Sequence, residues 1–189
     1  MKFRSAVHRS TVIIVILIAS VILGYGYQVG CEYLDRRKNP REYAEFVSLY
    51  AEEYGIPEYM VYAMISVESG FRSGAVSDDG RIGLMQVSPD HLEWLSSSMR
   101  EPLEQRALHD PETNIRCGCY YLAYLYSLYG RWTPTLAAYE TNPDDVTFWS
   151  LEDALTDKAG NLLRTPYGDL NEKIEAIEEK ADVYRSLYY

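Results

Sequence analysis

Apolar side chains recur at helical spacing along most of the chain after residue 40. The first such segment carries a single apolar stripe made of Tyr43, Phe46, Val47, Tyr50 and Tyr54. Gly55 then suits the end of one helix and Pro57 the first turn of the next. The pattern therefore predicts a helix from about residue 41 and a second helix that ends at Gly70.

Later helices are predicted by a polar residue followed by proline, a pairing that favours a helix start. Three such pairs are Ser88-Pro89, Asp110-Pro111 and Thr133-Pro134. A last helix is predicted from about Leu170. Between the second and third helices lies a glycine-rich loop in which Asp79-Gly80 is a strong turn signal and permits a small hairpin. We expect a mainly α domain with at most a small β element.

An uncharged apolar run at residues 12–29 precedes this domain. As a helix it would be about 27 Å long, close to the hydrocarbon thickness of a bilayer. We predict a short basic cytoplasmic segment at 1–11, a transmembrane anchor at 12–29, a charged linker at 30–40 and the domain at 41–189. The alternatives are a cleaved signal peptide, for which a small-x-small site is missing, and a lipoprotein signal at Cys31.

The composition excludes some classes of function. The chain has 189 residues and a formal net charge of -10, and this acidic balance argues against a nucleic-acid footprint, which needs clustered Lys and Arg. We therefore predict no nucleic-acid partner. The three cysteines include Cys117 and Cys119, whose spacing is not a zinc pattern. We expect free, structural thiols and no metal site.

Glu68 is the residue whose position needs an explanation. On a helix it shares one face with three apolar residues, Val61, Met64 and Ile65. Burial on that face and the negative end of the helix dipole would both raise the pKa of its carboxyl group. A carboxylic acid that keeps its proton near neutral pH suits a general acid. The alternative is a side chain that turns to solvent or pairs with Arg72 or Arg81.

The residues that follow Glu68 form a specific string. It reads Glu-Ser-Gly-Phe at 68–71, Ala-Val-Ser at 75–77, then Gly80, Gly-Leu-Met-Gln at 83–86 and Pro89. This string resembles the signature of lytic transglycosylases of the soluble-type (SLT) group, which have a lysozyme-like fold related to goose-type lysozyme. Residues 110–122 and 136–139 resemble the next two motifs of that family.

The resemblance implies roles for five residues. Glu68 would be the catalytic acid and then the base. Gln86 would bind the glycan through its amide, with a structural bond inside the loop as the alternative. Ser77 would bond near the scissile linkage. Met85 and Tyr139 would line the sugar groove, with packing in the core as the alternative.

The implied reaction needs one carboxylate, whereas ordinary glycosidases use a pair. It cleaves the β-1,4 bond between N-acetylmuramic acid and N-acetylglucosamine in a peptidoglycan glycan strand. The C6 hydroxyl of the muramic acid attacks, which leaves a 1,6-anhydro end, and no cofactor is needed. Because this substrate lies outside the cell membrane, we expect a single-pass protein with a cytoplasmic N-terminus and an extracytoplasmic domain.

The chain departs from the family pattern at two places. In the motif that starts at Leu136, Glu140 replaces an amide, and Asn142 and Asp144 replace glycines, although Asn and Asp tolerate left-handed backbone better than most residues. Near the C-terminus, Lys173 takes the place of a tyrosine. If Lys173 reached Glu68, it would favour the ionised carboxylate and oppose the acid role.

These departures keep two other functions open. One is a catalytically weak or inactive glycan-binding module that docks to a cell-envelope assembly. The other is a lysozyme-type hydrolase in which Asp78, Asp79 or Asp90 would hold the attacking water.

Overall fold

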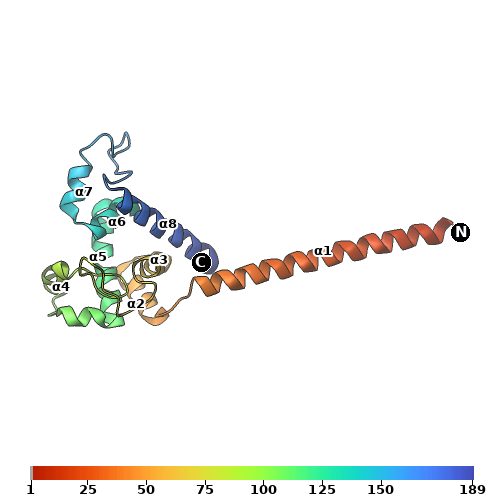
Figure 1. Ribbon diagram of the computed structural model, residues 1–189, viewed down its shortest axis with the longest axis horizontal. Helices are drawn as coiled ribbons and strands as arrows, with labels where there is room; N and C mark the ends of the chain where they lie inside the picture. The colour runs from red at the N-terminus through yellow and green to blue at the C-terminus, as the bar shows by residue number, and fades with distance from the viewer. Residues whose placement is uncertain (1) are drawn as a thin grey trace. The chain divides into compact units, whose positions relative to one another are not determined.

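The computed structural model describes the backbone from residue 2 and the side chains from residue 17 onward. Its contacts divide the chain into two units, which meet between Pro40 and Arg41. The first unit is the helix α1 (Lys2–Lys38) (Figure 1). The first part of the predicted anchor at 12–29 lies outside the residues whose side chains are described. Within the part that is described, no helix combines the length and the apolar character needed to cross a membrane.

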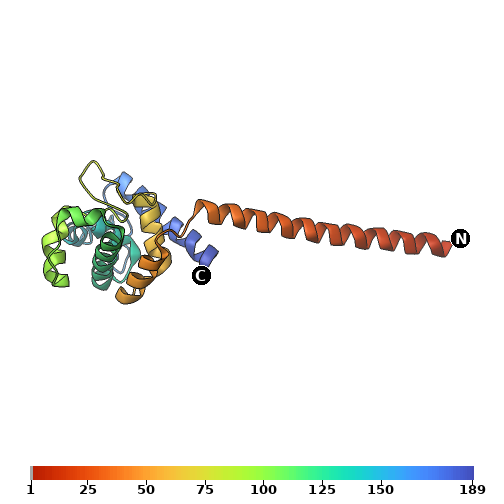
Figure 2. The same ribbon diagram turned by 90° about the horizontal axis from the view of Figure 1, so that it is seen from below.

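The second unit is mainly helical, as the sequence predicted. α8 lies along α3, and α5 packs against α2 and α6 (Figure 1, Figure 2). Among the described residues, β structure is limited to isolated antiparallel bridges, two in the loop after α3 and one between residues 156 and 162. The helices are α2 (Ala44–Tyr54), α3 (Glu58–Glu68), α4 (Leu92–Met99), α5 (Pro111–Tyr129), α6 (Trp132–Glu140), α7 (Pro143–Trp149) and α8 (Gly168–Tyr188), with 3-10 turns η1 (Pro89–His91) and η2 (Gln105–His109).

Local chemistry sets the helix ends. Gly55 ends α2 with a left-handed φ of 70°, where a side chain would be strained. The hydroxyl of Ser88 accepts a bond from the backbone at the start of η1, and the carboxylate of Asp110 caps α5 through the N–H of Thr113 at 2.9 Å. The signals at Ser88-Pro89 and Asp110-Pro111 are thus confirmed. The helix predicted from Thr133-Pro134 is present but begins at Trp132, and Pro57 precedes α3 as its N-cap instead of lying in its first turn.

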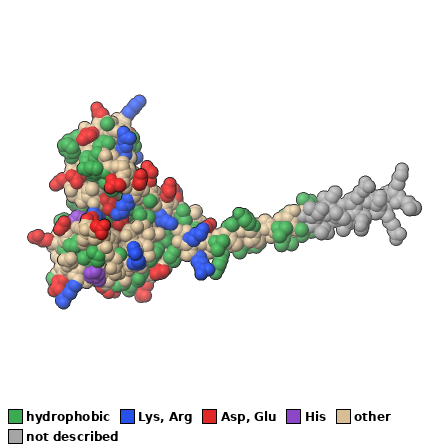
Figure 3. Space-filling view, viewed as in Figure 1, with side chains coloured by type: hydrophobic (Ala, Val, Ile, Leu, Met, Phe, Trp, Pro, Cys, Tyr) green, Lys and Arg blue, Asp and Glu red, His purple; other side chains and the backbone are tan. Residues whose placement is uncertain are grey.

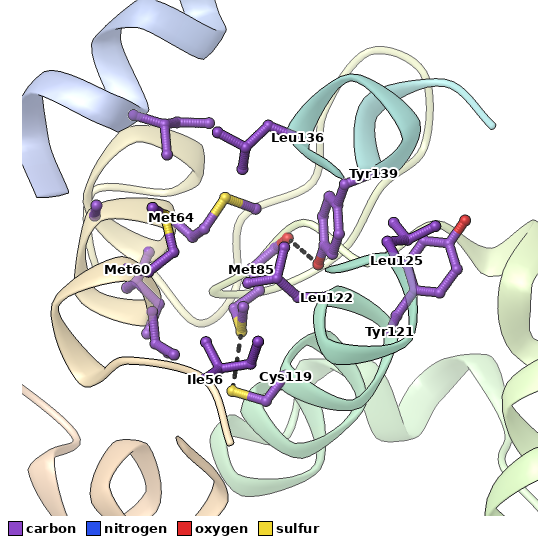
Figure 4. Close-up of a cluster of buried hydrophobic side chains, with 14 of the residues drawn as sticks. Ile56, Met60, Met64, Met85, Cys119, Tyr121, Leu122, Leu125, Leu136 and Tyr139 are labelled. Atoms are coloured by element: carbon purple, nitrogen blue, oxygen red, sulfur yellow. Dashed lines mark hydrogen bonds between the residues drawn. The ribbon is translucent and has the colours of Figure 1, made fainter. Parts of the chain in front are cut away.

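α3 runs through the core. Residues 60–65 are all buried, so the helix is covered on every side and not on one face alone. Met85 packs between α3 and α5, where its sulfur lies 4.0 Å from the thiol of Cys119 (Figure 4). Gly118 leaves the space for it, because an added Cβ there would be 2.5 Å from that sulfur. This packing joins α3 and α5 in the core.

Asn114 of α5 anchors the loop that follows α3. Its side chain is fully buried, accepts a bond from the N–H of Met85 at 2.8 Å and donates to the carbonyl oxygens of Ile82 and Leu108, both at 2.8 Å. Gly83 has a φ of 81°, and a Cβ there would overlap the Asn114 amide. The loop after α3 is therefore held to the core by a side chain that has no polar group left unpaired.

Candidate active site

Glu68 is the last residue of α3, and its side chain is only 2% exposed. Its Oε2 accepts a hydrogen bond from Nζ of Lys173 on α8 at 2.9 Å. Its Oε1 is buried and has no partner. The side chain of Glu68 therefore does not turn to solvent. It does not pair with Arg72, which bonds to a backbone carbonyl, or with Arg81, which pairs with other carboxylates. Both alternatives for this residue are wrong.

Glu140, the last residue of α6, completes the cluster. Its side chain is 8% exposed, and its Oε2 lies 2.8 Å from Nζ of Lys173 and 3.6 Å from Nη1 of Arg81. Its Oε1 is also buried without a partner. Two carboxylates, Glu68 and Glu140, therefore share the single ammonium group of Lys173.

The cluster perturbs the protonation of its members. Burial raises the pKa of Glu68 to about 8, the nearby Glu140 carboxylate adds to this shift, and Lys173 opposes it without reversing it. For Lys173, burial lowers the pKa, but the two carboxylates outweigh burial and raise it overall. Burial and Glu140 thus favour a neutral Glu68, whereas the two carboxylates favour a charged Lys173.

Arg81 links the loop after α3 to the end of α6. Its guanidinium pairs with Oδ2 of Asp79 at 3.0 Å and donates to the backbone carbonyls of Tyr139, at 3.1 Å, and Glu140. The side chain is 10% exposed, so these bonds replace the water that the guanidinium would otherwise bind. They hold the guanidinium of Arg81 with its Nη1 at 3.6 Å from the Glu140 carboxylate.

Ser77 and Gln86 are engaged within the loop itself. The hydroxyl of Ser77 donates to the Asp79 carboxylate and accepts from the N–H of Arg81 at 2.9 Å. Gln86 is 3% exposed, and its amide donates to the carbonyl of Gly83 at 2.8 Å and to a second loop carbonyl at 3.3 Å. The structure thus contains the loop bond given as the alternative for Gln86. Roles for these two side chains toward a glycan stay predictions.

Met85 and Tyr139 both pack in the core (Figure 4). Met85 is fully buried and Tyr139 is 1% exposed. The phenol of Tyr139 donates to the backbone carbonyl of Met85 at 2.9 Å, and burial raises its pKa well above the ordinary value. In this conformation the two side chains adopt the core alternative.

Comparison with known proteins identifies the domain. The model of the transglycosylase SLT domain matches residues 45–160. The chain belongs to this family. The chain is 30% identical over 175 residues to membrane-bound lytic murein transglycosylase C of Serratia proteamaculans, covering 88% of the chain and 45% of the relative. The homologue from Pectobacterium atrosepticum is 31% identical over 172 residues with the same coverage. The chain thus spans less than half of the length of these relatives.

Solved structures share the lysozyme-like fold. The 70 kDa soluble lytic transglycosylase of Escherichia coli has a TM-score of 0.72 and 26% identity, covering 80% of this chain and 25% of that one. A complex of a 70 kDa soluble lytic transglycosylase with bulgecin A gives a TM-score of 0.73 at 25% identity and the same coverage. An inactive mutant of the Pseudomonas aeruginosa enzyme has a TM-score of 0.71 at 24% identity and supports the fold alone.

The segment where this SLT domain departs from the family signature has a structure of its own. Asn142 has an extended backbone with a φ of −163°, and its side chain caps α7 through the N–H of Asp145 at 2.9 Å. Neither Asn142 nor Asp144 has a positive φ among the described residues. Left-handed backbone, which Asn and Asp would tolerate, is therefore not adopted at either position. The chain instead begins a new helix here, with Asn142 as its N-cap.

Two hollows border this segment. One, of about 300 Å³, is lined in part by Glu140, Thr141 and Lys173. The other, of about 350 Å³, is lined by aromatic rings and by residues 142–144. The visible face of the domain carries many acidic side chains (Figure 3). The sequence did not predict that Glu140 would reach Glu68 through Lys173, although opposite charges at the two departing positions were a usable signal.

Proposed function

We propose that this chain is a lytic transglycosylase of peptidoglycan, in which Glu68 acts first as the general acid and then as the general base. The observation that carries the proposal is a buried carboxyl group with a pKa raised to about 8, which stands where the SLT signature has its glutamate. The names of the relatives, lytic murein transglycosylases, support the reaction type.

The oxygen of Glu68 that has no protein partner carries the acidic proton. Because Oε2 accepts from Lys173, the proton of the neutral carboxyl belongs on Oε1, which has no protein partner. This proton passes to the glycosidic oxygen as the β-1,4 bond breaks. The carboxylate then takes the proton of the C6 hydroxyl as its oxygen bonds to the anomeric carbon. The bond closes a 1,6-anhydro ring on N-acetylmuramic acid, and no water is consumed.

Lys173 has a defined part in this cycle. Its ammonium group stabilises the Glu68 carboxylate that exists between the two proton transfers. Once Glu68 is protonated again, the ammonium group is shared between Glu68 and Glu140 as before. A glycosidase with two catalytic carboxylates keeps them about 5 Å or more apart, with the sugar between them. Here Glu140 is turned toward Lys173 and Arg81, which favours the single-carboxylate reaction.

Digestion of purified peptidoglycan tests this function. We expect muropeptides with anhydro ends by mass spectrometry, and a loss of rate of about 10²–10⁴-fold in Glu68→Gln. The matched control is Glu172→Gln, an exposed glutamate on α8, which should digest as fast as the wild type. Reducing ends would instead support the hydrolase alternative.

A glycan-binding module remains the second candidate, and the contact between Lys173 and Glu68 at 2.9 Å favours it. If that contact held Glu68 ionised, the domain would bind glycan strands without cutting them. Sedimentation of the protein with insoluble peptidoglycan, with no soluble product released by the wild type, would support this role over the enzyme.

We also propose that residues 12–29 anchor the chain in the cell membrane, with the domain on the outer side. The uncharged run and the membrane-bound relatives support this. The full chain should stay with membranes after carbonate washing, and added protease should reach the domain from the outside. A variant that lacks residues 1–30 should be released.

A further inference from the structure

The two departures from the family signature contact each other. Glu140 and Lys173 lie 33 residues apart in sequence, and their charged groups meet at 2.8 Å. Each change alone would harm the site. Lys173 alone would hold Glu68 ionised, and Glu140 alone would place a second carboxylate next to it in a buried setting. Together they form one ion pair beside Glu68.

The sharing of one ammonium group decides where a proton binds. If both were ionised, the two buried carboxylates of Glu68 and Glu140 would lie together around Lys173. Burial strengthens the repulsion between these like charges, and one bound proton removes it. Glu140 faces two cations, Lys173 and Arg81, and Asp79 pairs with Arg81 and is 65% exposed. Glu68 shares one cation, Lys173, with Glu140, so the bound proton resides on Glu68.

We propose that Glu140 is a positioning residue that divides the Lys173 ammonium between two carboxylates and thereby keeps the proton on Glu68. Arg81 assists from the far side, because its guanidinium is fixed to the carbonyls at the end of α6 and attracts the Glu140 carboxylate. The consequence for catalysis depends on the proposed function, whereas the location of the proton is a property of the folded domain.

The other groups near Glu68 do not replace this effect. Tyr139, from α6, stays neutral because burial raises its pKa well above the ordinary value. If Glu140 loses its charge, Arg81 keeps its contact with Asp79 and its carbonyl partners. Lys173 alone is then free to pair fully with Glu68.

The loss of Glu140 and the loss of Lys173 should therefore move the pKa of Glu68 in opposite directions. In Glu140→Gln, Lys173 pairs with Glu68 alone and a like charge is lost, so the pKa of Glu68 should fall by about 1–3 units. In Lys173→Met, Glu68 keeps the Glu140 carboxylate and loses its cation, so its pKa should rise. The double variant removes both charges and should return the pKa above that of Glu140→Gln.

Carbon-13 labelling of the glutamate carboxyl groups, followed by NMR as a function of pH, measures this without turnover. The signal that is missing in Glu68→Gln identifies residue 68. Glu172→Gln serves as the control and should leave the midpoint unchanged. An unchanged midpoint in Glu140→Gln would overturn the proposal. If that variant fails to fold by circular dichroism, an unchanged or lowered midpoint in Lys173→Met would overturn it.

The pH profile of anhydro-product formation separates this inference from the proposed function. The alkaline limb should follow the NMR midpoint in each variant, and Glu140→Gln should lose about tenfold in rate at pH 7 if the pKa falls by 2 units. A wild type with no anhydro product but with the expected NMR shifts would refute the function and keep the inference. An active wild type with an unchanged midpoint in Glu140→Gln would do the reverse.

Discussion

The proton held on Glu68 makes the stability of the folded domain depend on pH. Burial and Glu140 raise the pKa of Glu68 from 4.5 to about 8 in the folded state. The stabilisation by the protonated carboxyl is complete below pH 4.5. As the pH rises from 4.5 to 8, the unfolded chain releases the proton while the folded chain must keep it or ionise a buried group, so this stabilisation is lost. Each unit of difference is worth about 1.4 kcal/mol.

Glu68→Gln should remove this dependence while it keeps the size of the side chain. Between pH 5 and 8.5 we expect the unfolding free energy of the wild type to fall by about 4 kcal/mol more than that of the variant. The variant should thus be the more stable protein at alkaline pH, even though it has lost its acid. A large gain in stability from changing one polar residue identifies a carboxyl group that is buried at a cost.

Urea denaturation of residues 41–189 and of the full chain, followed by circular dichroism at several pH values, measures this difference. Titrating groups outside the cluster of Glu68, Glu140 and Lys173 contribute equally to both proteins and cancel in the comparison. Glu172→Gln should run parallel to the wild type. Parallel pH curves for Glu68→Gln and the wild type would refute the reasoning, because they would mean that Glu68 titrates in the folded domain as it does in the unfolded chain.

Three further predictions concern packing and thiol reactivity. Gly83→Ala should destabilise the domain by at least about 2 kcal/mol in urea denaturation because of its positive φ and the overlap with Asn114, while Gly74→Ala, which has open space, should be nearly neutral. Asn114→Ala should cost about 2–4 kcal/mol because it leaves buried backbone groups unpaired, and a loss below 1 kcal/mol would contradict its anchoring role. Iodoacetamide should label Cys31 much faster than the buried Cys119 in the native protein, since burial raises the pKa of the Cys119 thiol, and equal rates would contradict this burial.

Helical periodicity and capping chemistry predicted much of the fold, because both are local. The polar-proline signals located the starts of η1 and α5. The same signal at Asn142-Pro143 marks α7, which was not predicted because the segment is short and lies where the family signature has glycines. The burial of α3 on all sides depends on α8, which packs against it from more than 100 residues further along the chain.

The chemistry of Glu68 was predictable only in part. Its apolar helix face indicated a raised pKa, and burial is indeed the largest cause. The sequence also indicated that Lys173 would oppose the shift if it came close, and it does. The outcome depends on Glu140, whose approach to Lys173 follows from the packing of α6 and α8 and has no local signature.

The attachment of Arg81 to the end of α6 limits how the chain can change length. Surface loops usually tolerate insertions, but Arg81 joins the loop after α3 to carbonyl groups 58 and 59 residues further on, and Asn114 holds the part of the loop beyond it. An epitope or added segment placed between Arg81 and Gln86 would shift these attachments and move Glu140. The same insertion at the exposed turn of Asp78 and Asp79 would disturb the pair of Asp79 with Arg81 but leave the attachments to α6 and to Asn114 in place, so variation in loop size among related sequences should be confined to that turn.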